Sequence, residues 1–545
     1  MNTKNKTKRL IITLVPLVIA VLVMAPRLAS PQFGLFDDGL NYIQVEKIRG
    51  GDFSMSYDLQ AGRFRPFYWL YFTLIYTLAG PNPFWFFFGH LIILLVLLIE
   101  IRSLMKSMGA KDEHILLTQC VFLFSVPIIE NFYTLSKGDP LSLVFILASL
   151  LSFTKLQRSN QAPARVAYLA LAFINGLFAI WAKETAYIMA PISAGWAGYV
   201  LLKRKDYTPW KVKSYALYFA AMVGAMGAFF LIRSFVGAPP VTGGTFTERY
   251  IFTWEAILSR IPRWMTLIAH YYHYLVPLAA IALLMMISKQ KIEPDQGLDF
   301  FAWGLWLLAW IGSLLPWEYA EAYYLLAFSL GVAILVGLIA PHIPNLVQTA
   351  KPWIRWATLV MTALFALLFL VSLTHYRTHA RAQLIFDRMN KEMLNITLQI
   401  TPEDGHVFTN LEEKNEYVEE IQYFLVDFYG LTEIEYAHID AEMLERLHLY
   451  PDGVVLMPYV DNMPRLLLRA GVDEDSAMLW NEIVLRNQGD RFVPVAQVHD
   501  QFRVINLNLP VVVCPLIGSI GFCNEPDPLF DTRVFSYGWD IYTIQ

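Results

Sequence analysis

Eleven apolar segments between residues 10 and 374, each close to the length of a membrane-crossing helix, constrain this chain more than any other feature. A spanning helix needs about 20 mostly apolar residues. Hydrophobic residues make up 56% of the 545 residues and charged residues 16%, a composition too apolar for a water-soluble protein. We therefore expect a mainly α-helical, polytopic bundle with spans at 10–26, 83–105, 113–129, 140–156, 165–182, 185–202, 212–235, 265–288, 300–316, 321–340 and 355–374.

The charges between these segments indicate how the chain is threaded through the membrane. If the N-terminus lies inside, every inner connection carries Lys or Arg, as the positive-inside rule requires, and the basic run within 203–213 is the clearest case. With eleven spans, the C-terminal region then lies outside. Counting the short aromatic stretch 66–78 as a twelfth span would invert this pattern, so we expect it to form a helix at the outer interface.

The N-terminus carries basic residues before the first apolar segment, a pattern shared by cleaved signal peptides and signal anchors. We favour an uncleaved anchor, because a first helix that stays is the commoner case in a multispanning protein. The small residues Ala29 and Ser30 would permit cleavage, so that alternative stays open.

Polar residues return after about residue 375, and hydrophobicity becomes periodic rather than continuous. The chain is expected to divide into a transmembrane domain, 1–374, and a soluble α/β domain, 375–545, on the outer side. Within the second domain, helical patterns alternate with strand-like runs, at 415–429, 441–448, 453–459 and 511–514.

Few features indicate a nucleic acid, a metal or a cofactor. The net charge is −4, so no global positive field favours nucleic acid. The histidines show no metal-ligand spacing, and only a carboxylate-bound divalent cation stays open as a cofactor. Cys514 and Cys523 lie in one loop-like segment and would be able to pair in an oxidising space.

Paired carboxylates, Asp37 and Asp38, follow the first span directly. Ionised groups so near a bilayer are costly unless they are solvated, paired or functional. A carboxylate beside a second carboxylate has its ionisation shifted, which suits a general base acting on a hydroxyl. The simpler interpretation is a solvated turn, since Asp-Asp-Gly is good turn chemistry.

Further ionisable residues stand at the outer ends of other spans. Each has a simple explanation: a wet loop, a pair between Lys183 and Glu184, or arginines reaching lipid headgroups. Their recurrence favours convergence on one cavity, and the planar guanidinium groups of Arg63 and Arg65 would be able to bind a phosphate. The loop 236–264 resembles a lid over that cavity. The residues concerned are Arg63, Arg65, Glu130, Lys137, Asp139, Lys183, Glu184, Glu318 and Glu321.

Four of these stretches, in this order, resemble the C-type superfamily of integral membrane glycosyltransferases, in particular protein O-mannosyltransferases and their bacterial relatives. A weaker fifth match is Glu321-Ala322-Tyr323-Tyr324 through Gly331, and together the matches cover about residues 10–340. The four are Phe36-Asp37-Asp38-Gly39, Phe64-Arg65-Pro66-Phe67-Tyr68-Trp69-Leu70 leading to Gly80-Pro81-Asn82-Pro83, Glu130 through Asp139, and Ala182-Lys183-Glu184-Thr185 followed by Pro191.

The resemblance implies an enzyme that moves a sugar from a polyprenyl-phosphate donor to an acceptor hydroxyl on the extracytoplasmic side, in a bacterial inner (plasma) membrane. The acceptor is a protein, a lipid or a glycan. Asp37 is implied as the base, with Asp38 in support, and Arg65, Lys137 and Lys183 as groups facing the lipid-linked phosphate. Arg63 is expected beside Arg65, and the outer-loop carboxylates Glu130, Asp139, Glu184, Glu318 and Glu321 in supporting places.

Two departures from the family pattern affect these expectations. Ser136-Lys137-Gly138-Asp139 stands where relatives have Ser-Gly-Arg and a later Asp, and Glu321-Ala322-Tyr323 replaces Glu-Arg-Tyr. Two other functions stay open: a transporter or flippase of lipid-linked glycans, and a glycan polymerase. The one-sided clustering of charge and the lack of pseudo-symmetry between halves count against a transporter.

Overall fold

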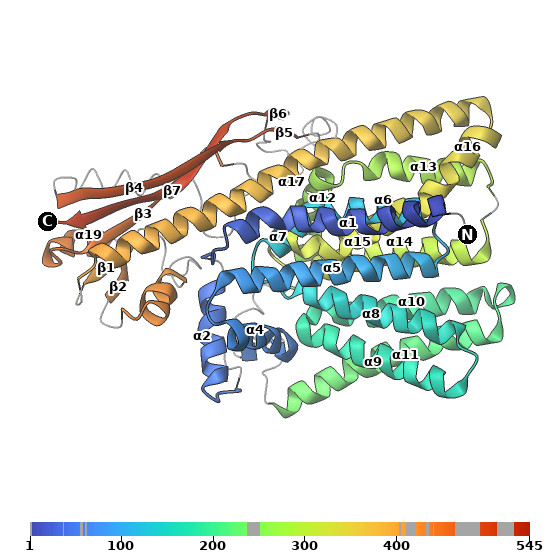
Figure 1. Ribbon diagram of the computed structural model, residues 1–545, viewed down its shortest axis with the longest axis horizontal. Coiled ribbons are helices and arrows are strands. Elements are labelled where there is room, and N and C mark those ends of the chain that lie inside the picture. Colours follow the sequence, from blue (N-terminus) through green and yellow to red (C-terminus); the bar gives the residue numbers. More distant parts are fainter. Residues whose placement is uncertain are drawn as a thin grey trace.

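The chain folds into a long helical bundle with a small β-sheet domain at one end. The computed structural model describes residues 3–545 apart from 36, 55–57, 60–62, 237–250, 291, 403–404, 410–419, 432–434, 440, 464–490 and 509–527. The N-terminus lies at the end of the bundle that is far from the sheet (Figure 1).

Nine helical segments of the described chain are long and apolar enough to cross a membrane, and two bent helix pairs raise the number to eleven if each pair is one span. The predicted helical bundle is confirmed, and the number of spans reaches the predicted eleven when each bent pair is one span. The chain is an integral membrane protein. The nine are α1 (Thr3–Ala29), α5 (Pro83–Ser107), α8 (Asp139–Arg158), α9 (Ala162–Ala182), η1 with α10 (Glu184–Ile188, Met189–Leu202), α11 (Pro209–Phe235), α14 (Pro294–Leu314), η3 to α16 (Ala322–Leu325, Leu326–Ile339, Ala340–His342, Ile343–Thr349) and α17 (Pro352–Ile400).

The two bent pairs replace spans that hydropathy alone predicts as straight. Helices α6 (Asp112–Leu123) and α7 (Val126–Phe132) meet at 61°, where Pro127 in the first turn of α7 lacks the N–H that would continue α6. Helices α12 (Trp254–Tyr271) and α13 (Leu275–Ile287) meet at 87°. Both bends place polar backbone near the sheet-facing end of the bundle.

Helices α2 (Asp38–Arg49) and α4 (Pro66–Ala79) lie beside each other at that same end (Figure 1). The predicted helix at 66–78 is therefore present as α4. Its exposed apolar side chains are Leu70, Leu74 and Leu78, four residues apart, which gives one continuous apolar stripe. Such a stripe suits a helix lying flat in the membrane interface.

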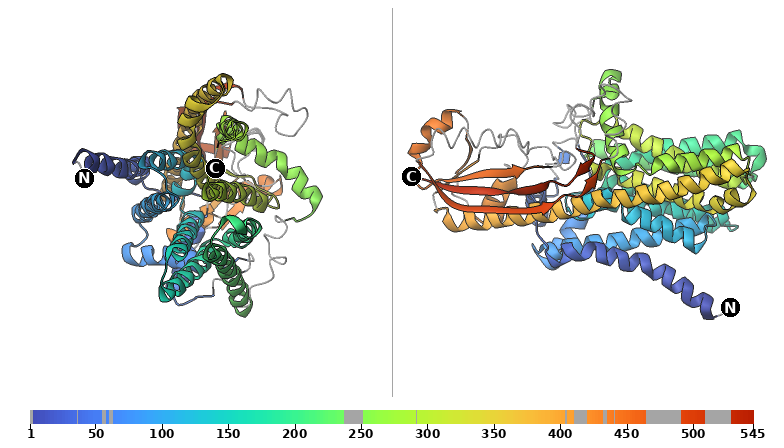
Figure 2. Two further views of the ribbon diagram at one scale, coloured as in Figure 1. Left: turned by 90° about the vertical axis from the view of Figure 1, so that its right-hand side faces the viewer. Right: turned by 90° about the horizontal axis from the view of Figure 1, so that it is seen from above.

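Helix α17 joins the two parts of the molecule without a break. It has 49 residues and continues through 374–375, the position at which the domain boundary is predicted. Its first half crosses the bundle and its second half runs under the sheet (Figures 1 and 2). The two predicted domains therefore share one helix instead of a flexible linker.

The sheet has five strands in the order β2-β1-β3-β7-β4. Strand β1 pairs in parallel with β2 and β3, whereas β7 pairs antiparallel with β3 and β4. The strands are β1 (His406–Thr409), β2 (Glu435–His438), β3 (Val454–Asp461), β4 (Phe492–Arg503) and β7 (Val534–Ile544), and a separate pair is formed by β5 (Asn506–Leu507) and β6 (Phe530–Asp531).

Helix α17 packs on the sheet through apolar side chains and one polar anchor. Phe386 lies against Tyr537 with ring centroids 4.6 Å apart. The buried Asn390 accepts hydrogen bonds from the Tyr537 hydroxyl at 2.8 Å and from the Trp539 indole at 2.9 Å. Because each of these polar groups is satisfied inside the core, the sheet is held at one register on the helix.

The predicted elements of the second domain are partly confirmed. The helix at 441–448 appears as α19 (Ala441–Arg446) and η6 (Leu447–Leu449), and the strand at 453–459 as β3. The helical pattern at 415–429 ends in a π-helix, η5 (Tyr423–Phe428). The strand expected at 511–514, the pairing of Cys514 with Cys523 and residues 237–250 of the lid expected at 236–264 lie outside the described residues. The described end of that lid segment includes the start of α12.

The topology makes a prediction that reporter fusions can check. A periplasmic reporter enzyme fused after Gln545 should be active, and the same reporter fused after Lys205 should be inactive. A fluorescent protein that folds only in the cytoplasm should give the opposite pattern at both positions. The reverse result would place the sheet domain inside and contradict the positive-inside assignment.

Candidate active site

Asp37 stands at the start of α2 and faces outward. Its backbone is left-handed, with φ of 63°, a conformation that Asp tolerates better than most residues. Its side chain makes no capping hydrogen bond to α2 and is 40% exposed. It forms an ion pair with Lys137, whose Nζ lies 3.9 Å from Oδ2 of Asp37. The carboxylate is thus paired with an ammonium and still open to solvent.

Lys137 lies in the turn between α7 and α8, and the turn packs tightly on the end of α9. A Cβ at Gly138 would lie 2.6 Å from the carbonyl oxygen of Ala182, so only glycine permits this approach. The Lys137 side chain is 6% exposed, and Nζ lies 4.2 Å from the ring centroid of Tyr323. Burial over an aromatic face is a favourable setting for a cation.

Lys183 follows α9 and reaches the same aromatic group from the other side. Its Nζ lies 5.8 Å from the Tyr323 ring and 5.4 Å from the Tyr324 ring. It forms an ion pair of 3.1 Å with Asp139, the first residue of α8. Two ammoniums and two carboxylates from three separate segments, at residues 37, 137–139 and 183, therefore gather near Tyr323.

Glu184 is turned away from its neighbour Lys183. Its Oε1 accepts a hydrogen bond of 2.6 Å from the backbone N–H of Phe64. The pair between Lys183 and Glu184 considered from the sequence is replaced by the pair with Asp139. Glu184 instead fastens the segment that precedes α4 to the end of α9.

Arg63 and Arg65 share a buried carboxylate that sequence reasoning missed. Asp58 accepts two hydrogen bonds from Arg65, at 2.7 and 3.1 Å, and one of 2.7 Å from the Trp69 indole. Arg63 forms a longer ion pair with Asp58 at 3.5 Å. Burial favours the neutral acid, but the two guanidiniums outweigh it and hold the pKa of Asp58 below its usual range.

This pairing gives Arg65 a structural role in the described state. We expect Asp58→Asn to lower the free energy of unfolding by about 3 kcal/mol, because the variant leaves a buried guanidinium without its counter-ion. Thermal unfolding of the purified protein in detergent measures the effect. Glu46→Gln, which breaks the exposed ion pair with Arg49, is the control and should cost less than about 1 kcal/mol. Equal losses in both variants would contradict the assignment.

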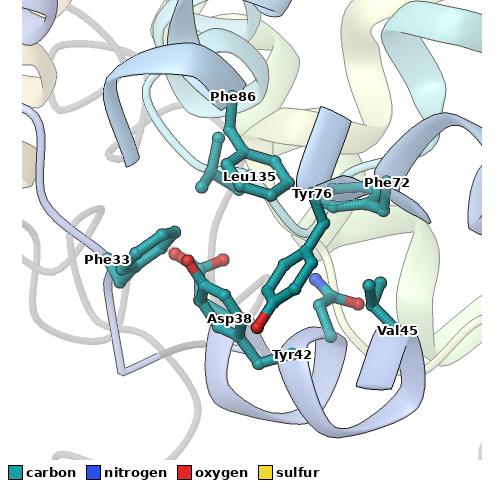
Figure 3. A pocket seen from close by; sticks show the side chains of 9 residues that line it. Phe33, Asp38, Tyr42, Val45, Phe72, Tyr76, Phe86 and Leu135 are labelled. Atoms are coloured by element: carbon teal, nitrogen blue, oxygen red, sulfur yellow. The ribbon is translucent and has the colours of Figure 1, made fainter. Parts of the chain in front are cut away.

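Asp38 differs sharply from its neighbour Asp37, because it points inward. It is 3% exposed and lines a small pocket with aromatic walls that include Phe33, Tyr42 and Phe86 (Figure 3). One of its oxygens accepts a hydrogen bond of 2.8 Å from the Gly34 N–H, and the other has no hydrogen-bond partner among the described residues.

Burial raises the pKa of Asp38 to about 8, and the carboxylate of Asp387 adds to this effect. The Gly34 N–H and the guanidinium of Arg27, which pairs with Asp387, act in the opposite direction. Asp38 therefore holds its proton at neutral pH, whereas Asp37 is the carboxylate that faces outward. The two adjacent acids therefore have different surroundings.

The pKa of Asp38 predicts how stability depends on pH. The folded pKa of about 8 exceeds the ordinary value of 3.8, so the folded protein binds the extra proton and loses stability as pH rises from about 4 to 8. Asp38→Asn should flatten this part of the profile of unfolding temperature against pH, while Asp52→Asn, at an exposed site, should keep the wild-type slope. Parallel profiles for wild type and Asp38→Asn would show that Asp38 does not titrate there.

Glu130 lies on α7 and is bound from α17. Its two oxygens accept from His379, at 2.6 Å, and from Gln383, at 2.9 Å. The other ring nitrogen of His379 lies 2.9 Å from the Tyr271 hydroxyl. Glu130 therefore supports the site indirectly, by joining α7 to the long helix.

The remaining predicted residues lie at the edge of the site. Glu321 directly precedes η3, which carries Tyr323. Glu318 is exposed, and its backbone carbonyl accepts from Arg263 at 3.4 Å. In the part of the chain that the structure describes, no group of three or more His, Cys, Asp or Glu side chains is placed to hold a metal ion.

One further residue is brought to the site by the sheet domain. Glu420, just before η5, is 3% exposed and accepts hydrogen bonds from the backbone N–H groups of Gly39 and Leu40. Neither Glu420 nor Asp58 has a local sequence signal, since each is defined by a partner that only the folded chain supplies. In a sequence, a carboxylate within an amphipathic helical pattern is normally interpreted as part of the solvent-exposed face of the helix.

Comparison with known proteins gives matches in structure only. No protein-family model matches the chain, and no curated protein matches its sequence. The structure is similar to ArnT from Cupriavidus metallidurans bound to undecaprenyl phosphate, with 13% identity, a TM-score of 0.49 and coverage of 81% of this chain and 92% of ArnT.

Two further solved structures are also similar. The archaeal oligosaccharyltransferase AglB from Archaeoglobus fulgidus, in complex with an inhibitory peptide and a dolichol-phosphate, is 12% identical, with a TM-score of 0.49 over 77% of this chain and 64% of AglB. The arabinofuranosyltransferase AftD from Mycobacteria is 11% identical, with a TM-score of 0.45 over 96% of this chain and 41% of AftD.

Proposed function

We propose that the protein is a membrane glycosyltransferase that moves a sugar from a polyprenyl-phosphate donor to an acceptor hydroxyl on the extracytoplasmic side. The observation that carries the proposal is the exposed carboxylate of Asp37 beside the two ammoniums that surround Tyr323. A base for the acceptor and cations for a phosphate are the two groups that this reaction needs. The motifs that resemble C-type glycosyltransferases supply the same residues.

The reaction follows from these charges as one displacement at the anomeric carbon. Asp37 takes the proton of the acceptor hydroxyl, the acceptor oxygen bonds to the anomeric carbon, and the bond from that carbon to the phosphate oxygen breaks. The electron pair leaves with the polyprenyl phosphate, whose charge becomes more negative by one. Because protonated Asp37 no longer attracts Lys137, that ammonium is released to stabilise the leaving phosphate together with Lys183.

Arg65 is less suited to this step than Lys137 and Lys183. Its guanidinium is already engaged by Asp58, whereas the lysines pair with carboxylates at the edge of the site. Arg65 would instead hold the start of α4 in place beside the donor. The proposal also specifies the donor as a polyprenyl-phosphate sugar and the location as a bacterial inner membrane. The acceptor is a protein, a lipid or a glycan.

The test is single-turnover transfer from a panel of polyprenyl-phosphate sugars by the purified protein in nanodiscs, with and without a chelator. Asp37→Asn keeps the size of the side chain and removes its basicity, so transfer should fall at least about 100-fold. Asp52→Asn removes an exposed carboxylate outside the site and should leave the rate unchanged.

Two outcomes would contradict the proposal in different ways. Undiminished transfer by Asp37→Asn would show that Asp37 is not the catalytic base. No turnover from any donor, despite saturable binding of the lipid, would favour a flippase of lipid-linked glycans. Loss of transfer in the presence of the chelator would show that the reaction requires a divalent cation.

A further inference from the structure

Glu420 connects the sheet domain to the helix that follows the proposed catalytic base. It lies 381 residues from Gly39 in the sequence, and its Oε2 accepts the Gly39 N–H at 2.6 Å. Its Oε1 accepts the Leu40 N–H at 3.2 Å. Both oxygens of one buried carboxyl group are thus used on two successive backbone donors.

These two donors belong to the first turn of α2. The first N–H groups of a helix have no partner within the helix and are usually satisfied by the side chain of the N-cap residue. Asp37 occupies the N-cap position but makes no capping hydrogen bond. Glu420 supplies the cap from another domain, so the carboxylate of Asp37 is not used by its own helix and points toward Lys137.

The packing around this cap leaves no space for displacement. A Cβ at Gly39 would lie 2.9 Å from Oε2 of Glu420, 3.2 Å from Cβ of Tyr423 and 3.3 Å from the Phe424 ring. The contact continues along α2, where the rings of Tyr42 and Phe428 have centroids 5.1 Å apart. The absence of a side chain at Gly39 therefore allows Glu420, Tyr423 and Phe424 to pack directly against α2.

The chemistry of Glu420 makes glutamine a close replacement. Burial raises the pKa of Glu420 well above its ordinary value, and the nearby carboxylate of Asp37 adds to the effect. A neutral carboxyl group still accepts through its carbonyl oxygen, and so does an amide. Glutamine keeps this acceptor and the length of the side chain, whereas alanine removes both.

We propose that Glu420 is a positioning residue: by capping α2 it fixes the place of Asp37, and it thereby makes the sheet domain a part of the active site. The inference rests on the proposed function for its effect on turnover, because Glu420 acts through Asp37 and does not reach the reacting atoms. The cap itself is a structural statement that can be measured without any substrate.

The experiment combines single-turnover transfer with hydrogen exchange of the α2 peptide in the full-length protein. Glu420→Ala should lower the turnover rate at least 10-fold, leave the donor KM within 2-fold, and accelerate exchange at Gly39 and Leu40. Glu420→Gln should retain turnover within 3-fold and keep the protection of one of the two N–H groups, because its amide has a single acceptor oxygen. Gly39→Ala, which displaces the carboxyl group from the other side, should reproduce both effects of Glu420→Ala.

Two controls separate positioning from a general loss of structure. Glu46→Ala removes an exposed carboxylate from the same helix and should leave turnover and exchange unchanged. Glu420→Asp keeps the carboxyl group but withdraws it by one methylene, so it should lower turnover even where Glu420→Ala does not fold.

Each contrary result overturns a defined part of the inference. Wild-type turnover in Glu420→Ala or Glu420→Asp removes the positioning role, and a Glu420→Gln variant as slow as Glu420→Ala shows that the cap is not what matters. If the wild type transfers no sugar from any donor, the proposed function fails, and the exchange data alone decide the cap. Unchanged exchange at Gly39 and Leu40 in Glu420→Ala would then show that Glu420 does not cap α2.

Discussion

The backbone contact between Gly138 and Ala182 is the constraint on which the arrangement of the site depends. Any side chain at position 138 would overlap the Ala182 carbonyl, so the start of α8 and the end of α9 can adjoin only with glycine there. Lys137 and Lys183 each stand next to this contact in the sequence, and both ammoniums are therefore brought to one tyrosine. Their mutual repulsion is offset by Asp37 and Asp139, which pair with them.

The bundle could be predicted from the sequence because membrane insertion is largely a property of each segment by itself. A stretch of about 20 apolar residues needs no knowledge of its neighbours to be recognised. Two spans are bent, and only the bend at Pro127 has a cause that is visible in the sequence. The order of the outer-loop motifs likewise indicated that Asp37, Lys137 and Lys183 would meet.

What the sequence could not supply is which charged groups satisfy each other. Arg65 is held by Asp58, seven residues earlier, and Glu130 by side chains some 250 residues later. The difference between Asp37 and Asp38 is of the same kind, because it follows from where α2 begins and from the aromatic pocket behind it. Adjacent identical residues carry no information about which of them will be buried.

The unbroken course of α17 has a mechanical consequence. From Asp387, which is paired with Arg27 of α1, to its end at Ile400 the helix extends about 20 Å beyond the bundle. A rod of that length turns a tilt of one degree at its base into a displacement of about 0.35 Å at its tip, a large part of the tolerance of a hydrogen bond. The buried pairs Arg27–Asp387 and Glu130–His379 brace this lever near its pivot. Changes in bilayer thickness or lateral pressure that tilt α17 would thus be transmitted, amplified, to the sheet domain and its contact with α2.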